Sequence, residues 1–235
     1  MNFIPRNVAP FERYRNELAR LRVGLGQLLD HHVPLATRFV GSGGLFFTAD
    51  LWMLGVAQRS FQLVEGFLQT FDSWNVTVAA PLVRFQIENL VRTTYVMQAD
   101  GGQRIILRLI GGEQLNRMKA WDDPKQTLTD AELVRRAGKL VAWLPDVYEV
   151  SNEWVHLSNR HIFNASRLKE SAEPMPAIVS RIPLPIDEIP VSFLEELLGA
   201  MRQATRDLFG WFEAWEDWKA THPEAEHPLT AEQRE

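Results

Sequence analysis

Apolar residues recur every three or four positions over most of this chain, which is the spacing of an α-helix. The first such run covers residues 10–31, and four leucines define its apolar face: Leu18, Leu21, Leu25 and Leu28. A glycine-rich segment at residues 41–44 follows and predicts a flexible hinge. Residues 1–44 are therefore expected to form an N-terminal helix and a hinge.

Two longer helices are expected next, over residues 45–74 and 76–98. The first has one wide apolar face. The second has apolar residues around most of its circumference, which predicts a central and largely buried helix. Shorter helices are expected over residues 103–121, 129–143 and 148–163.

The pattern changes after residue 163. Two short stretches that are partly β-branched, residues 162–168 and 177–184, can pair as a β-hairpin. A capping box at residues 192–195 predicts a last helix that runs to about Lys219. The sequence thus predicts a mainly α, single-domain protein of about seven helices, with the helical bundle domain over residues 45–220 and a short hairpin before the last helix. A disordered acidic tail is expected over residues 221–235.

Charge and composition exclude several classes of function. The whole net charge of −5 is carried by the chain from residue 213 onward, so the body is neutral and does not have the charge of a strongly basic nucleic-acid-binding protein. The absence of cysteine excludes disulfides, thiolate nucleophiles and cysteine-based zinc sites, and fits a reducing cytoplasm. No leader peptide is expected, because the first residues have no continuous apolar core behind a basic end. No membrane span is expected, because charged residues interrupt the most apolar segment, residues 45–74.

Polar side chains gather on one stripe of the helix expected over residues 148–163. They recur at about whole helical turns: Tyr148, Asn152, His156 and Asn159. A separate apolar stripe of the same helix can dock on the core. Because histidine titrates near neutral pH and can act as a general acid or base, the polar stripe is a candidate site.

A second polar stripe lies on the central helix, where Arg84, Glu88 and Arg92 are spaced by four residues. If the two stripes face each other, Glu88 orients His156 and the arginines supply positive charge for a phosphate group. The alternative is a structural network of ion pairs that satisfies buried polar groups and fixes the register of the helices.

Other catalytic arrangements do not fit the spacing. Ser151 and His156 lie five positions apart on the expected helix and cannot pair there as nucleophile and base. His156 and His161 point to different faces, and the His31-His32 pair falls at the expected exposed end of the first helix, so no metal site is expected. No cofactor motif is present, because the glycine-rich segment lacks the Lys-Ser/Thr ending of a phosphate-binding loop.

The segment Ser-Asn-Glu-Trp-Val-His at residues 151–156 resembles the Arg-Asn-x-x-x-His motif of the HEPN superfamily. Proteins of that superfamily are small all-helical bundles, often dimeric, and many are metal-independent RNases of bacterial toxin–antitoxin and antiphage systems. Asn152 and His156 match the motif, whereas Ser151 stands where the family has an arginine that helps to hold the scissile phosphate. Three other arginines can stand in for it: Arg84, Arg92 and Arg160.

The chain also resembles an uncharacterised bacterial helical family over residues 45–218. The shared features are an Arg-x-x-x-Glu helix (Arg84 to Glu88), a Ser-x-x-x-Val-His segment that ends at His156, a hairpin and a final helix.

Together the resemblances imply a HEPN-like protein of a bacterial defence or toxin–antitoxin system, which binds RNA or a nucleotide, acts with a protein partner or as a homodimer, and is a degenerate metal-independent RNase. The expected catalytic residues are His156, Asn152 and Glu88, and the expected substrate-binding residues are Arg84, Arg92, Tyr148 and Arg160. The alternative is a non-catalytic helical module that binds a protein partner, through a homodimer face or through its acidic tail and tryptophan-rich last helix.

Overall fold

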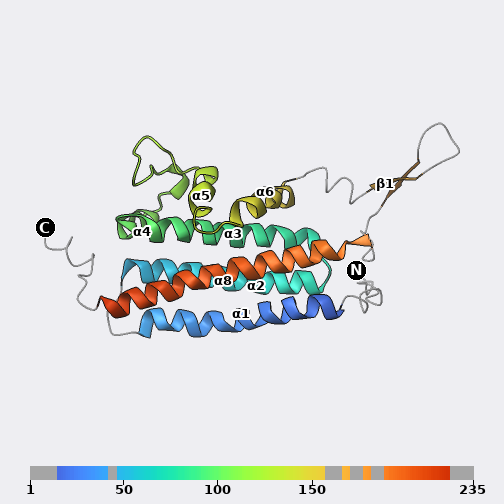
Figure 1. Ribbon diagram of the computed structural model, residues 1–235, viewed down its shortest axis with the longest axis horizontal. Helices are drawn as coiled ribbons and strands as arrows, with labels where there is room; N and C mark the ends of the chain where they lie inside the picture. The colour runs from blue at the N-terminus through green and yellow to red at the C-terminus, as the bar shows by residue number, and fades with distance from the viewer. Residues whose placement is uncertain (1–14, 42–46, 157–165, 170–176, 181–187, 223–235) are drawn as a thin grey trace.

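Four long helices run along the length of the molecule and form its core (Figure 1). The computed structural model describes residues 15–41, 47–156, 166–169, 177–180 and 188–222. The long helices are α1 (Arg15–Gly41), α2 (Thr48–Asp72), α3 (Val76–Gln98) and α8 (Val191–Thr221). Helix α8 packs against α1 and α3, and α2 packs against the same two helices. Each long helix therefore buries its apolar stripe against two neighbours.

Helix α3 is the centre of the molecule. Its residues Val83, Tyr95 and Val96 project to different sides and are all buried, because α2 and α8 cover one side and the short helices α4 to α6 cover the other. The bounds of α3 confirm the expected helix over residues 76–98 and its expected central position.

The remaining described helices are short. They are α4 (Gly102–Ile110), a 3-10 turn η2 (Leu115–Arg117), α5 (Asp130–Ala137) and α6 (Leu144–Val155). With the long helices they give seven α-helices in the described part of the chain, which confirms the mainly α bundle. No helix within the described ranges is long and apolar enough to cross a membrane.

Two of the short helices end earlier than expected. The helix predicted over residues 103–121 ends at Ile110, because Gly111 and Gly112 turn the chain, the latter with a positive φ of 91°. The helix predicted over residues 129–143 ends at Ala137, after which Gly138 lies against the ring of Pro145 at the start of α6.

Helix α1 is longer than expected. It continues through Pro34 to Gly41, so His31 and His32 lie inside the helix and not at an exposed end. The His32 side chain is buried between α2 and α8, where it meets Phe61 and Phe209. Packing on two neighbouring helices thus outweighs the hydrogen bond that the proline removes.

A buried ion pair joins α2 and α8 at one end of the bundle. Asp50 near the start of α2 is fully buried and accepts hydrogen bonds from Lys219 Nζ at 2.9 Å and from Trp215 Nε1 at 2.8 Å. Both partners belong to the last turns of α8. The carboxylate therefore has the partners that a buried charge requires.

Two short strands, β1 (Ser166–Lys169) and β2 (Ala177–Ser180), pair antiparallel. Their connection, residues 170–176, lies outside the described residues, so the hairpin stays a prediction. The expected acidic tail beyond residue 222 and most of the expected hinge also lie outside them. The expected division of the chain at residues 44 and 220 likewise stays a prediction.

Candidate functional site

A chain of buried polar side chains links the four long helices. His32 Nε2 on α1 lies 2.8 Å from Ser60 Oγ on α2, and Gln86 of α3 donates to that same Oγ at 2.6 Å and to Thr205 Oγ1 of α8 at 3.1 Å. His32 Nδ1 donates to the carbonyl of Leu28, so Ser60 donates to Nε2. Burial lowers the pKa of His32, which keeps the ring neutral in this arrangement.

This polar chain continues to the surface of the bundle between α2 and α3. Asn89 Nδ2 donates to Gln86 Oε1 at 3.1 Å, and Arg59 Nη1 donates to Asn89 Oδ1 at 2.5 Å. The other end of the Arg59 guanidinium lies 3.8 Å from a carboxylate oxygen of Glu88. Glu88 thereby connects the polar chain to the predicted polar stripe of α3.

Four of the predicted site residues meet where α6 crosses α3, and we call them the Arg84 cluster: Arg84, Glu88, Tyr148 and Asn152. The Arg84 guanidinium lies 3.6 Å from the centroid of the Tyr148 ring. Its Nη1 lies 3.0 Å from Glu88 Oε1, as an ion pair without a well-directed hydrogen bond, and its Nε lies 3.5 Å from Asn152 Oδ1. Burial raises the pKa of Tyr148, so its phenol is neutral and acts as a stacking surface.

The Arg84 side chain is only 8% exposed, whereas that of Glu88 is 23% exposed. An arginine with so little access to water is held by its partners and not by solvent. The cluster is therefore a contact between two helices, and Asn152 is its exposed edge.

Two predicted residues lie outside the Arg84 cluster, and a third cannot be placed. Arg92 turns to α5, where its Nη2 lies 3.1 Å from Asp130 Oδ1. His156 follows the end of α6 with an extended backbone (φ −95°, ψ 148°) and an exposed side chain. No carboxylate of the described residues lies within 4.0 Å of its ring. Arg160 and Asn159 lie outside the described residues.

The expected helix over residues 148–163 is wrong at both ends, and so is the expected contact from Glu88 to His156. Helix α6 begins at Leu144 and ends at Val155. Trp154 is the last buried residue of α6 and packs on Phe193 at the start of α8. A helix in a protein is held mainly by the packing of its apolar face, and Val155 and His156 are both exposed. Among the described residues, the polar stripe of α6 is therefore limited to Tyr148 and Asn152.

An open groove lies beside the Arg84 cluster, between α5 and α6. Tyr148 and Asn152 line it together with Arg135, Lys139 and Glu149, and its volume is about 640 Å³. This groove brings two predicted residues next to two cations that the sequence analysis did not select.

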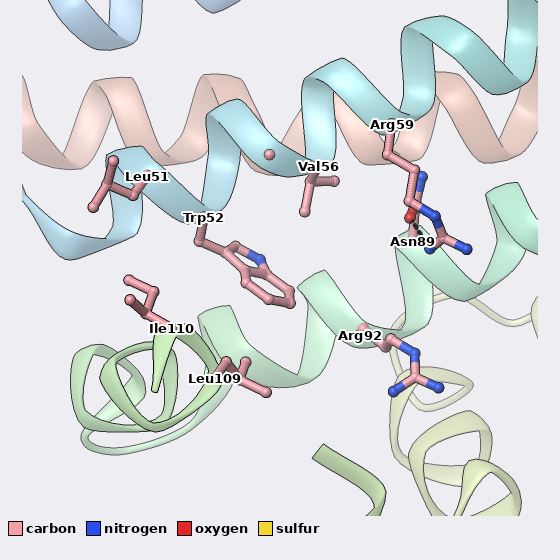
Figure 2. A pocket seen from close by; sticks show the side chains of 9 residues that line it. Leu51, Trp52, Val56, Arg59, Asn89, Arg92, Leu109 and Ile110 are labelled. Carbon is pink, nitrogen blue, oxygen red and sulfur yellow. Dashed lines mark hydrogen bonds between the residues drawn. The ribbon is translucent and has the colours of Figure 1, made fainter. Parts of the chain in front are cut away.

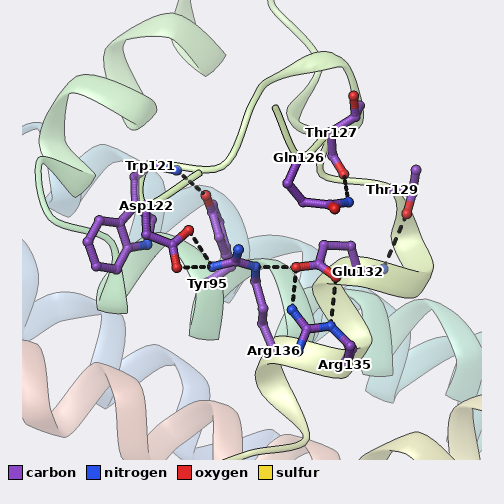
Figure 3. Close-up of polar contacts among 9 residues, drawn as sticks. All are labelled: Tyr95, Trp121, Asp122, Gln126, Thr127, Thr129, Glu132, Arg135 and Arg136. Carbon is purple, nitrogen blue, oxygen red and sulfur yellow. Dashed lines mark hydrogen bonds and ion pairs between the residues drawn. The ribbon is translucent and has the colours of Figure 1, made fainter. Parts of the chain in front are cut away.

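A network of ion pairs holds α5 to the preceding loop, and a hydrogen bond holds that loop to α3 (Figure 3). Glu132 Oε1 lies 2.6 Å from both Arg135 Nη2 and Arg136 Nε, and Arg136 also reaches Asp122. The guanidinium of Arg135, followed by that of Arg136, lowers the pKa of Glu132 to about 2. The hydroxyl of Tyr95 accepts from the backbone N–H of Trp121 at 3.2 Å. Every charge in this network has a partner, so its role is structural.

A cavity between α2, α3 and α4 was not predicted (Figure 2). Its volume is about 280 Å³, and nine residues line it: Leu51, Trp52, Gly55, Val56, Arg59, Asn89, Arg92, Leu109 and Ile110. The sequence carries one signal for it, because Trp52, Gly55 and Arg59 share a face of α2 at spacings of three and four residues. Trp52 and Val56 belong to the wide apolar face expected for residues 45–74, and the facing arginine, Arg92, comes from α3.

Comparison of the chain with models of protein families, with curated proteins and with solved structures found no match. The HEPN resemblance thus rests on residues 151–156 alone, and the resemblance to an uncharacterised helical family rests on the segments that carry it.

Proposed function

We propose that this protein is a non-catalytic helical binding protein and that its polar stripes form a structural network. The observation that carries the proposal is that Arg84 is enclosed by its neighbours. One face of its guanidinium is covered by Tyr148, its charge is paired with Glu88, and its side chain is 8% exposed. An arginine so enclosed is poorly placed to grip the phosphate of a substrate.

The position of His156 supports the same proposal. A general acid or base must lie within hydrogen-bonding distance of its substrate and is oriented by a neighbouring group. Glu88, the residue expected to orient His156, is instead paired with Arg84 and Arg59. With Ser151 in place of the motif arginine, and its hydroxyl donating to the carbonyl of Tyr148, the residues of a HEPN-type RNase do not form one site among the described residues.

The proposal is tested by incubating the purified protein with RNA in the presence of a chelator. We expect no cleavage above that of a mock preparation, and no difference between the native protein and His156→Ala. Cleavage that persists through purification and disappears in His156→Ala would overturn the proposal and support a HEPN-like RNase. Circular dichroism of the variant checks that it is folded.

RNA binding without cleavage is a second candidate function, and the groove between α5 and α6 favours it. One face of the Tyr148 ring carries Arg84, and Tyr148 also lines a groove that contains Arg135 and Lys139. Aromatic rings beside cations are the usual contacts of single-stranded RNA. Lys139→Ala is expected to weaken the binding of a labelled oligonucleotide, whereas Lys125→Ala, a matched change at an exposed lysine outside the groove, is not.

The HEPN relationship, the defence or toxin–antitoxin role and the homodimer remain proposals that rest on the resemblance. Light scattering over a range of protein concentrations tests the dimer directly. A single mass of one chain at every concentration would exclude it.

A further inference from the structure

The cavity between α2, α3 and α4 has two chemically different ends. Leucine, isoleucine and tryptophan side chains form one end, whereas Arg59, Asn89 and Arg92 form the other (Figure 2). We propose that this cavity is a binding site for a small hydrophobic carboxylate. The inference names a ligand for the binding role proposed above, and its test does not depend on the RNA-cleavage test.

The two arginines come from different helices and keep free hydrogen-bond donors. Arg59 uses Nη1 on Asn89 and lies 3.8 Å from Glu88, and Arg92 uses Nη2 on Asp130. A guanidinium carries five N–H groups, and neither Nε has an acceptor among the described residues. The side chains are 46% and 26% exposed, so an anion can reach both.

The local charge favours a ligand with a single negative charge. Arg59, Arg84 and Arg92 face two carboxylates, Glu88 and Asp130, which leaves one positive charge uncompensated. A carboxylate matches this excess and the planar geometry of a guanidinium. A polyphosphate would bring several charges that the site does not balance.

The other end of the cavity supplies apolar surface that the protein itself does not cover. Leu51 and Ile110 at its rim are 45% and 56% exposed. Trp52 extends from α2 towards α3 between this rim and the arginines (Figure 2). A volume of about 280 Å³ is at the small end for ligand sites, so the ligand has one ring or a short acyl chain.

Gly55 provides a direct way to block the site. It lines the cavity from the interior of α2, and a Cβ atom placed on it meets no atom within 4 Å beyond the adjacent residues and backbone of its own helix. Glycine is disfavoured inside a helix, so a larger residue here is compatible with the fold. Leucine at this position would occupy the space that the ligand needs.

The test is a calorimetric titration of the full chain with octanoate and with 4-phenylbutyrate. We expect saturable binding of at least one of them, at least tenfold weaker binding of octanamide, which lacks the charge, and no binding of inorganic phosphate, which lacks the apolar body. Tight binding of only one carboxylate identifies the apolar part as an acyl chain or a ring. No binding of either one, or binding of phosphate as tight as theirs, would overturn the proposal.

Two variants locate the site. Gly55→Leu is expected to weaken carboxylate binding at least tenfold while its melting temperature stays the same or rises. Gly210→Leu is the matched control, because Gly210 is an exposed glycine inside α8 with equally open surroundings. Arg59→Gln is expected to weaken binding of the carboxylates and to leave that of octanamide unchanged. Unchanged affinity in Gly55→Leu would show that the carboxylate binds elsewhere and would overturn the assignment.

Discussion

The guanidinium of Arg84 on α3 stacks on the ring of Tyr148 on α6, 3.6 Å from its centroid. The two residues are 64 positions apart in the sequence, and their contact is the central polar contact between these helices. The same guanidinium is paired with Glu88. Arg84, which was expected to bind a phosphate, thus stabilises the packing of α6 on α3.

Replacement of Arg84 by Met is expected to lower the free energy of unfolding by about 2 kcal/mol. The change removes a cation–π contact and leaves Glu88 with only the distant Arg59. Urea denaturation measures the effect. Arg92→Met is the control, and it should cost less than about 1 kcal/mol because its pair with Asp130 is more exposed. Equal losses in the two variants would contradict the structural role of Arg84.

Two adjacent buried threonines of α3 are expected to respond in opposite directions to replacement by valine. The hydroxyl of Thr93 has no hydrogen-bond partner among the described residues, whereas that of Thr94 accepts from Trp211 Nε1 at 2.9 Å. Thr93→Val should therefore raise the free energy of unfolding by about 1 kcal/mol, and Thr94→Val should lower it by about 1 kcal/mol. Thermal and chemical denaturation of both variants test the difference in sign.

Gly138→Ala is expected to destabilise the protein by about 1–3 kcal/mol. A Cβ atom there would lie 2.6 Å from Cγ of Pro145 and 3.2 Å from the carbonyl oxygen of Val134. Either α5 or the start of α6 would have to move. Gly210→Ala, where the added Cβ meets no atom within 4 Å beyond the adjacent residues and backbone of its own helix, should instead stabilise by about 0.5–1 kcal/mol. A neutral Gly138→Ala would mean that the contact with Pro145 relaxes freely.

The ion pairs of Glu132 with Arg135 and Arg136 are expected to make the free energy of unfolding depend on pH in the acid range. The folded pKa of Glu132, about 2, lies below the ordinary value of 4.5 because Arg135 and Arg136 hold its carboxylate. Its contribution is therefore fully present above about pH 4.5 and is lost as the pH falls towards 2. Unfolding curves between pH 7 and 2 should show a smaller loss of stability in Glu132→Gln than in the native protein. Parallel curves would exclude Glu132 as a source of the acid sensitivity.

The sequence was sufficient to predict the bounds of a helix where the pattern that defines them lies within that helix. Val83, Tyr95 and Val96 project to different sides of α3 and are all apolar or aromatic, and both bounds of that helix were predicted. The sequence was insufficient where the end or the course of a helix depends on contacts with a segment that is distant along the chain. The end of α6 depends on Trp154 meeting Phe193, and the course of α1 past Pro34 depends on α2 and α8.

The same limit applies to the two candidate sites. The spacing of Arg84 and Glu88 predicted their ion pair, because residues four apart on a helix are neighbours. The cavity was missed because its two arginines come from α2 and α3, and no local pattern shows that Arg59 and Arg92 lie on opposite walls of one space.

Folding cannot be completed during synthesis until Lys219 is available to form its ion pair with Asp50. Its two residues are separated by 169 positions, and chains grow at roughly 5–20 residues per second. Roughly 10 to 30 s therefore pass between the synthesis of Asp50 and that of Lys219. During that interval α1, α2 and α3 present the apolar faces that α8 will cover. We therefore expect the apolar surface that the nascent chain exposes to be largest just before α8 emerges.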